Sequence, residues 1–180
     1  CRDWSSDGAL PILAAGRLFE DYRDFAGSFT EIKRRARSLS GADRDRLLRI
    51  VDFLETELED SQIFTALSYR DYVNDSSLRR NVERWIENLV NASVDAAKII
   101  TASEKKQIPQ TYRETLKLLS TVKGFPETLA APLSDNTRLR NILAHEYLDI
   151  RYKFIESFLM DASLLYGELC LAVKRYAALP

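Results

Sequence analysis

The side chains with the most chemical potential lie in one short stretch, Arg138 to Tyr147, which reads RLRNILAHEY. It contains His145, the only histidine of the chain. Imidazole can accept and return a proton close to neutral pH, because its unperturbed pKa is about 6.5. Arg140 adds a permanent cation whose planar fork of donors fits phosphate oxygens. These are residue types that phosphodiester cleavage without a metal ion requires.

A helix over this stretch would arrange its polar residues in two stripes. Arg138, Asn141 and His145 would share one face, where Asn141 could orient the imidazole through a hydrogen bond. Arg140 and Tyr147, seven residues apart, would share a second face. About 140° separates Arg140 from His145 around a straight helix. The two therefore converge only if the helix ends near His145 or if another chain intervenes.

The string Arg140-Asn141-x-x-x-His145-x-Tyr147 resembles the HEPN superfamily and, within it, the HepT-like proteins. Helical patterning from about residue 43 to 176 and a Gly-Phe-Pro break before the motif are also similar, whereas residues 1–40 are not covered. The resemblance implies a small helical bundle that dimerises and acts as the toxin ribonuclease of a toxin–antitoxin pair. It also implies catalysis by the arginine and histidine in a cleft at the dimer interface.

The function expected from this resemblance is a metal-independent endoribonuclease without a cofactor. Arg140 and His145 would be catalytic, with Arg138 and Asn141 in support. The resemblance further implies that a partner nucleotidyltransferase antitoxin of the MntA type transfers AMP to Tyr147 and thereby blocks the cleft. AMP adds phosphate charge and bulk at the site of attachment.

A second class of function stays open. HEPN bundles also serve as noncatalytic partners of nucleotidyltransferases, in which Arg140 would hold a nucleotide phosphate without cleaving anything. Apart from the resemblance, a lone histidine is more often a structural residue, and Tyr147 could simply pack at the edge of a bundle with its hydroxyl in water. The presence of both Arg140 and His145 favours the enzyme, because a scaffold has no need of the pair.

Composition limits the remaining choices. A chain of 180 residues can bury a core of its own. Its net charge of −1 argues against bulk binding of nucleic acid, so any RNA contact must be focal. One histidine and two distant cysteines, Cys1 and Cys170, cannot supply the usual metal ligands. The cysteine usage, the lack of a signal-like start and the absence of an apolar run of about 20 residues favour the cytoplasm and no membrane.

The elements that must position the motif are helices throughout, which predicts an all-α, antiparallel, HEPN-like bundle over residues 41–180. Residues 1–40 would form an extension with an additional amphipathic helix. Its basic end, Lys33 to Arg37, is either a dipole-matched helix terminus or a patch that faces RNA.

Within the bundle, apolar stripes and local signals predict the individual helices. One of Asp75 to Ser77 would cap a long helix, and Thr111-Tyr-Arg-Glu114 is a capping box for the next. Pro132 with Ser134 to Asn136 would end the preceding helix and so reset the chain direction before the motif. Phe154, Phe158, Asp161 or Ala162, Leu165, Leu169 and Val173 would face the core from a last helix near residues 150–176.

Overall fold

The apolar stripes at helical spacing lie on helices in the computed structural model, which describes residues 39–178. These residues include no strand, so the all-α bundle is confirmed. The N-terminal amphipathic helix and its basic end lie outside the described residues, and the division at residue 40 stays a prediction. The elements in chain order are α2 (Gly41–Glu59), α3 (Ser61–Phe64), α4 (Tyr69–Asn74), α5 (Ser76–Ser103), α6 (Tyr112–Leu118), the 3₁₀ turn η1 (Leu119–Thr121), α7 (Glu127–Asn136), α8 (Arg138–His145) and α9 (Leu148–Ala178).

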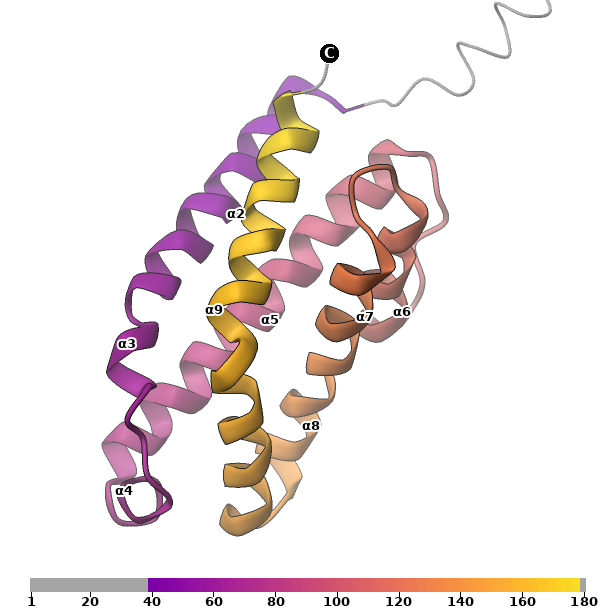
Figure 1. Ribbon diagram of the computed structural model, residues 1–180. Coiled ribbons are helices and arrows are strands. Elements are labelled where there is room, and N and C mark those ends of the chain that lie inside the picture. Colours follow the sequence, from indigo (N-terminus) through magenta and orange to yellow (C-terminus); the bar gives the residue numbers. More distant parts are fainter. Residues whose placement is uncertain (1–38, 179–180) are drawn as a thin grey trace, which may run out of the picture. The chain divides into compact units, whose positions relative to one another are not determined.

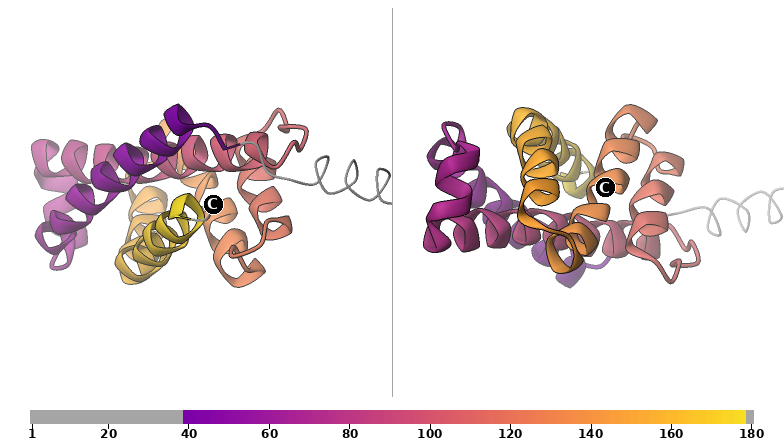
Figure 2. Two further views of the ribbon diagram at one scale, coloured as in Figure 1. Left: turned by 90° about the horizontal axis from the view of Figure 1, so that it is seen from above. Right: turned by 90° about the horizontal axis from the view of Figure 1, so that it is seen from below.

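Three long helices form the frame of the bundle. α9 runs antiparallel beside α2, and α5 crosses behind both of them (Figure 1). The short helices α6, α7 and α8 follow one another on the other side of α9, and the two views in Figure 2 show the same arrangement from the ends. α8 follows α7 and packs against α9 and α5.

The predicted helix starts arise from side-chain caps. Ser40 accepts a hydrogen bond from an amide in the first turn of α2, and Asp75 does the same for two amides of α5. These bonds from backbone amides lower the pKa of the Asp75 carboxyl. Thr111 accepts from the Glu114 amide at 3.2 Å and so caps α6, and its hydroxyl donates to the Glu114 carboxylate at 2.8 Å. Local sequence therefore fixes where these helices begin.

The predicted reset at Pro132 is wrong, because α7 continues through this proline to Asn136. A proline inside a helix removes one backbone hydrogen bond and crowds the preceding turn. Leu129 and Leu133 are buried on either side of it, so tertiary packing outweighs that local cost. The chain turns only at Thr137, the residue that separates α7 from α8.

The face predicted for the last helix is largely correct. Its apolar members from Phe158 to Val173 are buried, whereas Asp161 is exposed and Phe154 is 41% exposed beside α8. Cys170 is also buried, on the part of α9 that packs against α2. Burial raises the pKa of its thiol to about 11, and the nearby Glu55 carboxylate adds to the shift. None of the described helices combines the length and apolar character that crossing a bilayer requires.

Candidate active site on helix α8

α8 is a short amphipathic helix whose buried side fixes its orientation. Leu139 and Leu143 enter the core. Asn141, Ala144 and His145 are exposed on the side that faces away from the bundle. The motif therefore presents a small surface to solvent on a helix anchored by two leucines.

Arg140 and His145 lie at the two edges of this exposed surface. His145 lies five positions after Arg140. On a helix this spacing places the two side chains about 140° apart around the axis. The helix ends at His145, which is one of the two conditions given above for Arg140 and His145 to converge. No hydrogen bond joins Arg140 or Asn141 to His145 in the part of the chain that the structure describes, so one copy alone does not bring the predicted pair together.

The environment of Arg140 contains two residues that sequence reasoning did not single out. The Arg140 guanidinium carbon lies 5.1 Å from the centre of the Tyr112 ring. The Lys98 ammonium lies 5.0 Å from the centre of the same ring. We call Lys98, Tyr112 and Arg140 the Tyr112 cluster. The three residues come from α5, α6 and α8, so no local pattern in the sequence could have revealed them.

Arg138 points to a different place. With Asn136, Ile142 and Phe154 it lines a hollow of about 590 Å³ between α7, α8 and α9, and Asp161 lies on the α9 wall. The two arginines of the motif are separated by about 160° around α8. Arg138 is therefore removed from Arg140, and no contact with His145 supports its predicted assisting role.

Tyr147 does not share a helical face with Arg140, and that prediction is wrong. α8 ends at His145, Glu146 has extended backbone (φ −95°, ψ 163°), and α9 begins at Leu148. Tyr147 lies in the break between the two helices, and its side chain is 82% exposed. It is neither part of the α8 surface nor packed at the bundle edge, but it directly follows the end of the motif.

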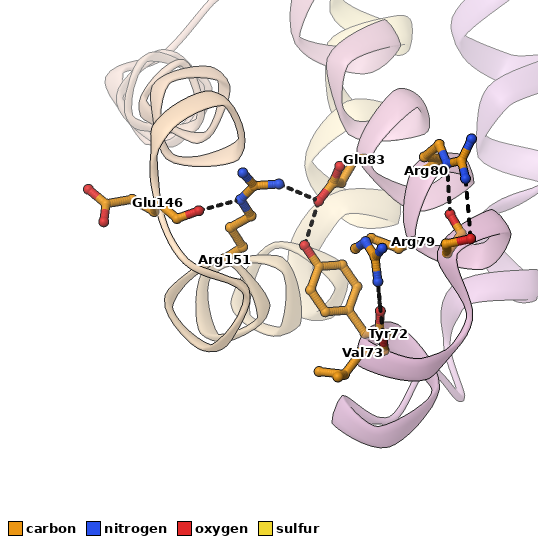
Figure 3. Close-up of polar contacts among 8 residues, drawn as sticks. Tyr72, Val73, Arg79, Arg80, Glu83, Glu146 and Arg151 are labelled. Atoms are coloured by element: carbon orange, nitrogen blue, oxygen red, sulfur yellow. Dashed lines mark hydrogen bonds and ion pairs between the residues drawn. The ribbon is translucent and has the colours of Figure 1, made fainter.

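A polar network holds this break in place (Figure 3). Arg151 Nε donates to the Glu146 carbonyl oxygen at 2.7 Å, and Arg151 Nη1 lies 3.3 Å from Glu83 Oε1. The Tyr72 hydroxyl donates to the same carboxylate oxygen at 2.5 Å. We call Tyr72, Glu83 and Arg151 the Glu83 network. It connects α4, α5 and α9 to the peptide between His145 and Tyr147.

The Glu83 network is largely shielded from water. The Arg151 and Glu83 side chains are 21% and 19% exposed, and Tyr72 is fully buried. Burial, and then the hydrogen bond to Glu83, raise the pKa of the Tyr72 hydroxyl above its ordinary value. The contacts among this tyrosine, carboxylate and arginine hold the backbone between α8 and α9 in one conformation. The sequence offered no signal for them, because their partners lie on distant helices.

The described residues contain no group of three or more His, Cys, Asp or Glu side chains placed to hold a metal ion. The polar groups of α8 include the Arg140 guanidinium and the His145 imidazole at the edges of one exposed surface. A guanidinium can bind an anion such as a phosphate, and an imidazole can transfer a proton.

Comparison with known proteins places this chain in a family. One solved structure, the tri-AMPylated HEPN toxin of Shewanella oneidensis in complex with an MNT antitoxin, superimposes with a TM-score of 0.63. The match covers 72% of this chain and 96% of that chain at 18% identity, which shows a shared fold. A search of curated proteins gives no match. The family model described as ribonuclease HepT-like matches residues 54–163, more than half of the chain, and the chain belongs to this HepT-like family.

Proposed function

We propose that this protein is the endoribonuclease toxin of a toxin–antitoxin pair and that Arg140 and His145 cleave RNA without a metal ion. The observation that carries the proposal is the position of these two residues at opposite edges of one exposed surface of α8, inside the region that matches the HepT-like family. A phosphate lying on this surface would meet a cation at one edge and an imidazole at the other.

The proposed chemistry is attack by a ribose 2′-hydroxyl on the adjacent phosphate. His145 accepts the hydroxyl proton as the 2′ oxygen bonds to phosphorus. The bond from phosphorus to the 5′ oxygen breaks, and that oxygen takes a proton from a general acid. The products are a 2′,3′-cyclic phosphate and a 5′-hydroxyl. Arg140 binds the phosphate oxygens and stabilises the charge of the transition state.

The second proton-transfer group would come from another copy of the chain. A single histidine per chain leaves either the acid or the base role unfilled. The exposed surface of α8 includes Ala144, whose small side chain allows close approach of a second helix. A two-fold dimer formed through this surface would bring both copies of Arg140 and His145 to one seam.

The proposal is tested by incubating the protein with RNA in EDTA and identifying the ends of the products. We expect 2′,3′-cyclic phosphate ends, a dimer in sedimentation, and a loss of roughly 100- to 10,000-fold in cleavage rate for folded His145→Ala. Full activity of the His145→Ala variant would contradict the catalytic role of His145. Full activity of a monomer would contradict a cleft shared between two copies of the chain. Binding of nucleotide by the parent chain without any cleavage would instead support a noncatalytic partner of a nucleotidyltransferase.

Control of the toxin would act through Tyr147. Its side chain is 82% exposed next to the end of the motif, so an enzyme can reach its hydroxyl. Transfer of AMP by a cognate nucleotidyltransferase antitoxin would add a phosphate charge directly beside His145, at the mouth of the proposed cleft. RNA phosphate would then be repelled from the surface that must bind it.

Co-expression with that nucleotidyltransferase, followed by intact mass measurement, tests the acceptor. We expect nucleotidyl adducts on the parent and on Tyr69→Phe, a matched control because Tyr69 is 47% exposed elsewhere on the bundle. Tyr147→Phe should carry no adduct, remain folded and keep its cleavage activity in the presence of the antitoxin. An equal adduct on Tyr147→Phe would show that another residue is the acceptor.

A further inference from the structure

The Tyr112 cluster is an unusual arrangement of charge. Two cations from different helices, Lys98 and Arg140, each lie about 5 Å from the centre of one tyrosine ring. Their charges are consequently no more than about 10 Å apart, close to the Debye length at physiological salt. They repel each other, and the electron-rich ring face offsets only part of that repulsion.

Carboxylates do little to neutralise the cluster. Arg140 makes no ion pair among residues 39–178. Lys98 has one acidic neighbour, Asp95, at 3.3 Å, and both side chains are well exposed, at 39% and 50%. A surface pair of this kind binds weakly and is screened by salt. The cluster therefore has a net positive charge on a chain whose total charge is −1.

Tyr112 is 40% exposed, so the cluster is open to a ligand from solution. The ring holds the Arg140 guanidinium on the side of α8 that borders the exposed surface of the motif. A polyanion that crosses this surface past Arg140 would next meet Lys98. A chain of phosphates could use both cations at once.

We infer that the Tyr112 cluster is a subsite for the RNA backbone beside the cleavage site. Lys98 binds a phosphate next to the scissile one, and Tyr112 is a positioning residue that holds Arg140 in place. This inference rests on the proposed function and extends it to a second phosphate. It also assigns no base stacking to Tyr112, since its ring is engaged by the two cations.

The experiment measures binding of single-stranded RNA to the full chain carrying His145→Ala, over a series of salt concentrations. Each phosphate contact contributes about 0.7 to the slope of log affinity against log salt for a single strand. Adding Lys98→Gln should weaken binding roughly three- to tenfold at moderate salt and reduce the slope by about 0.7. Lys117→Gln is the matched control: it is exposed on α6, about 140° around the helix from Tyr112, and should change neither quantity.

Two further variants separate a binding role from a packing role. Asp95→Asn removes the acidic neighbour of Lys98 and should tighten RNA binding without adding a contact. In the parent chain, Tyr112→Leu should lower the cleavage rate about tenfold, while Tyr112→Phe keeps the aromatic face and should stay within about twofold of the parent. The leucine variant must first be shown to have the parent's circular dichroism spectrum.

The outcomes distinguish this inference from the proposed function. If His145→Ala binds no RNA and the parent chain cleaves none, the proposed function fails. If RNA binds but Lys98→Gln leaves the slope unchanged, only the Lys98 subsite is wrong. Equal cleavage by Tyr112→Leu and the parent would refute the positioning role, and loss of thermal stability in Lys98→Gln without a change in slope would identify the cluster as packing alone.

Discussion

The Glu83 network and the Tyr112 cluster combine similar residues in opposite ways. Each joins a tyrosine to an arginine, and each reaches one end of the motif on α8. In the Glu83 network, the carboxylate of Glu83 accepts from both Tyr72 and Arg151. In the Tyr112 cluster, an aromatic ring meets two cations, and among the described residues one exposed carboxylate, that of Asp95, pairs with Lys98 while none pairs with Arg140. The first region satisfies its charge internally, whereas the second leaves charge available for an anion.

The comparison predicts its largest effect at Arg140. Arg140→Ala should lower RNA cleavage by roughly 1,000-fold, because it removes the cation at the reacting phosphate. Its melting temperature should change by less than about 2 °C, since Arg140 makes no ion pair among residues 39–178 and a half-buried cation over one tyrosine ring contributes little to folding. Arg138→Ala, on the same helix, should keep at least about a tenth of the parent rate. Equal losses of cleavage rate in Arg140→Ala and Arg138→Ala would show that the two faces of α8 do not differ in their role in cleavage.

Arg151 should show the reverse pattern. Arg151→Met removes the hydrogen bond to the Glu146 carbonyl and leaves the Glu83 carboxylate with Tyr72 alone. We expect a loss of about 2 kcal/mol in the free energy of unfolding, typical of a shielded bond to a charged group. The melting temperature should fall by roughly 6 °C for a domain of this size. Calorimetry that gives an unchanged melting temperature would show that the network does not stabilise the fold.

The smallest effect concerns alkaline pH. The folded state raises the pKa of Tyr72 above its ordinary value of about 10, through burial and the bond to Glu83. The Tyr72 hydroxyl therefore stabilises the fold below pH 10, and this contribution is lost as the pH rises further. Urea unfolding should show the parent chain more stable than Tyr72→Phe at pH 8, with a difference that shrinks above pH 10. A constant difference would indicate that Tyr72 does not titrate differently in the two states.

The sequence predicted what depends on neighbours along the chain. The caps at Asp75 and Thr111 and the buried stripe of α9 arise from side chains within a few positions of one another. The prediction failed at Pro132 because the buried Leu133 decides the local conformation through contacts that periodicity does not weigh. It failed at Tyr147 because the break after His145 is stabilised by Arg151 and its distant partner on α5.

The candidate site was predicted in its residues but not in its surroundings. Arg140 and His145 stand out by type and spacing, and a half-buried Arg140 with an exposed His145 on α8 agrees with a surface role. Lys98 and Tyr112 reach Arg140 from elements that precede it by many residues, so their contact depends on how α5 and α6 pack. Pairing across a bundle leaves no periodic signature in one sequence. The roles of residues 1–40 and of the proposed dimer seam stay predictions.

The buried thiol of Cys170 gives the protein a built-in reporter. Thiol reagents attack the thiolate, and burial together with a pKa of about 11 leaves almost none of it at neutral pH in the closed protein. Cys170 lies on the part of α9 that packs against α2, so labelling requires these helices to separate. In a Cys1→Ser chain, the labelling rate then measures the opening equilibrium of this pair under native conditions. Measured with and without RNA, this labelling rate would show whether RNA binding at α8 slows the opening of α2 and α9.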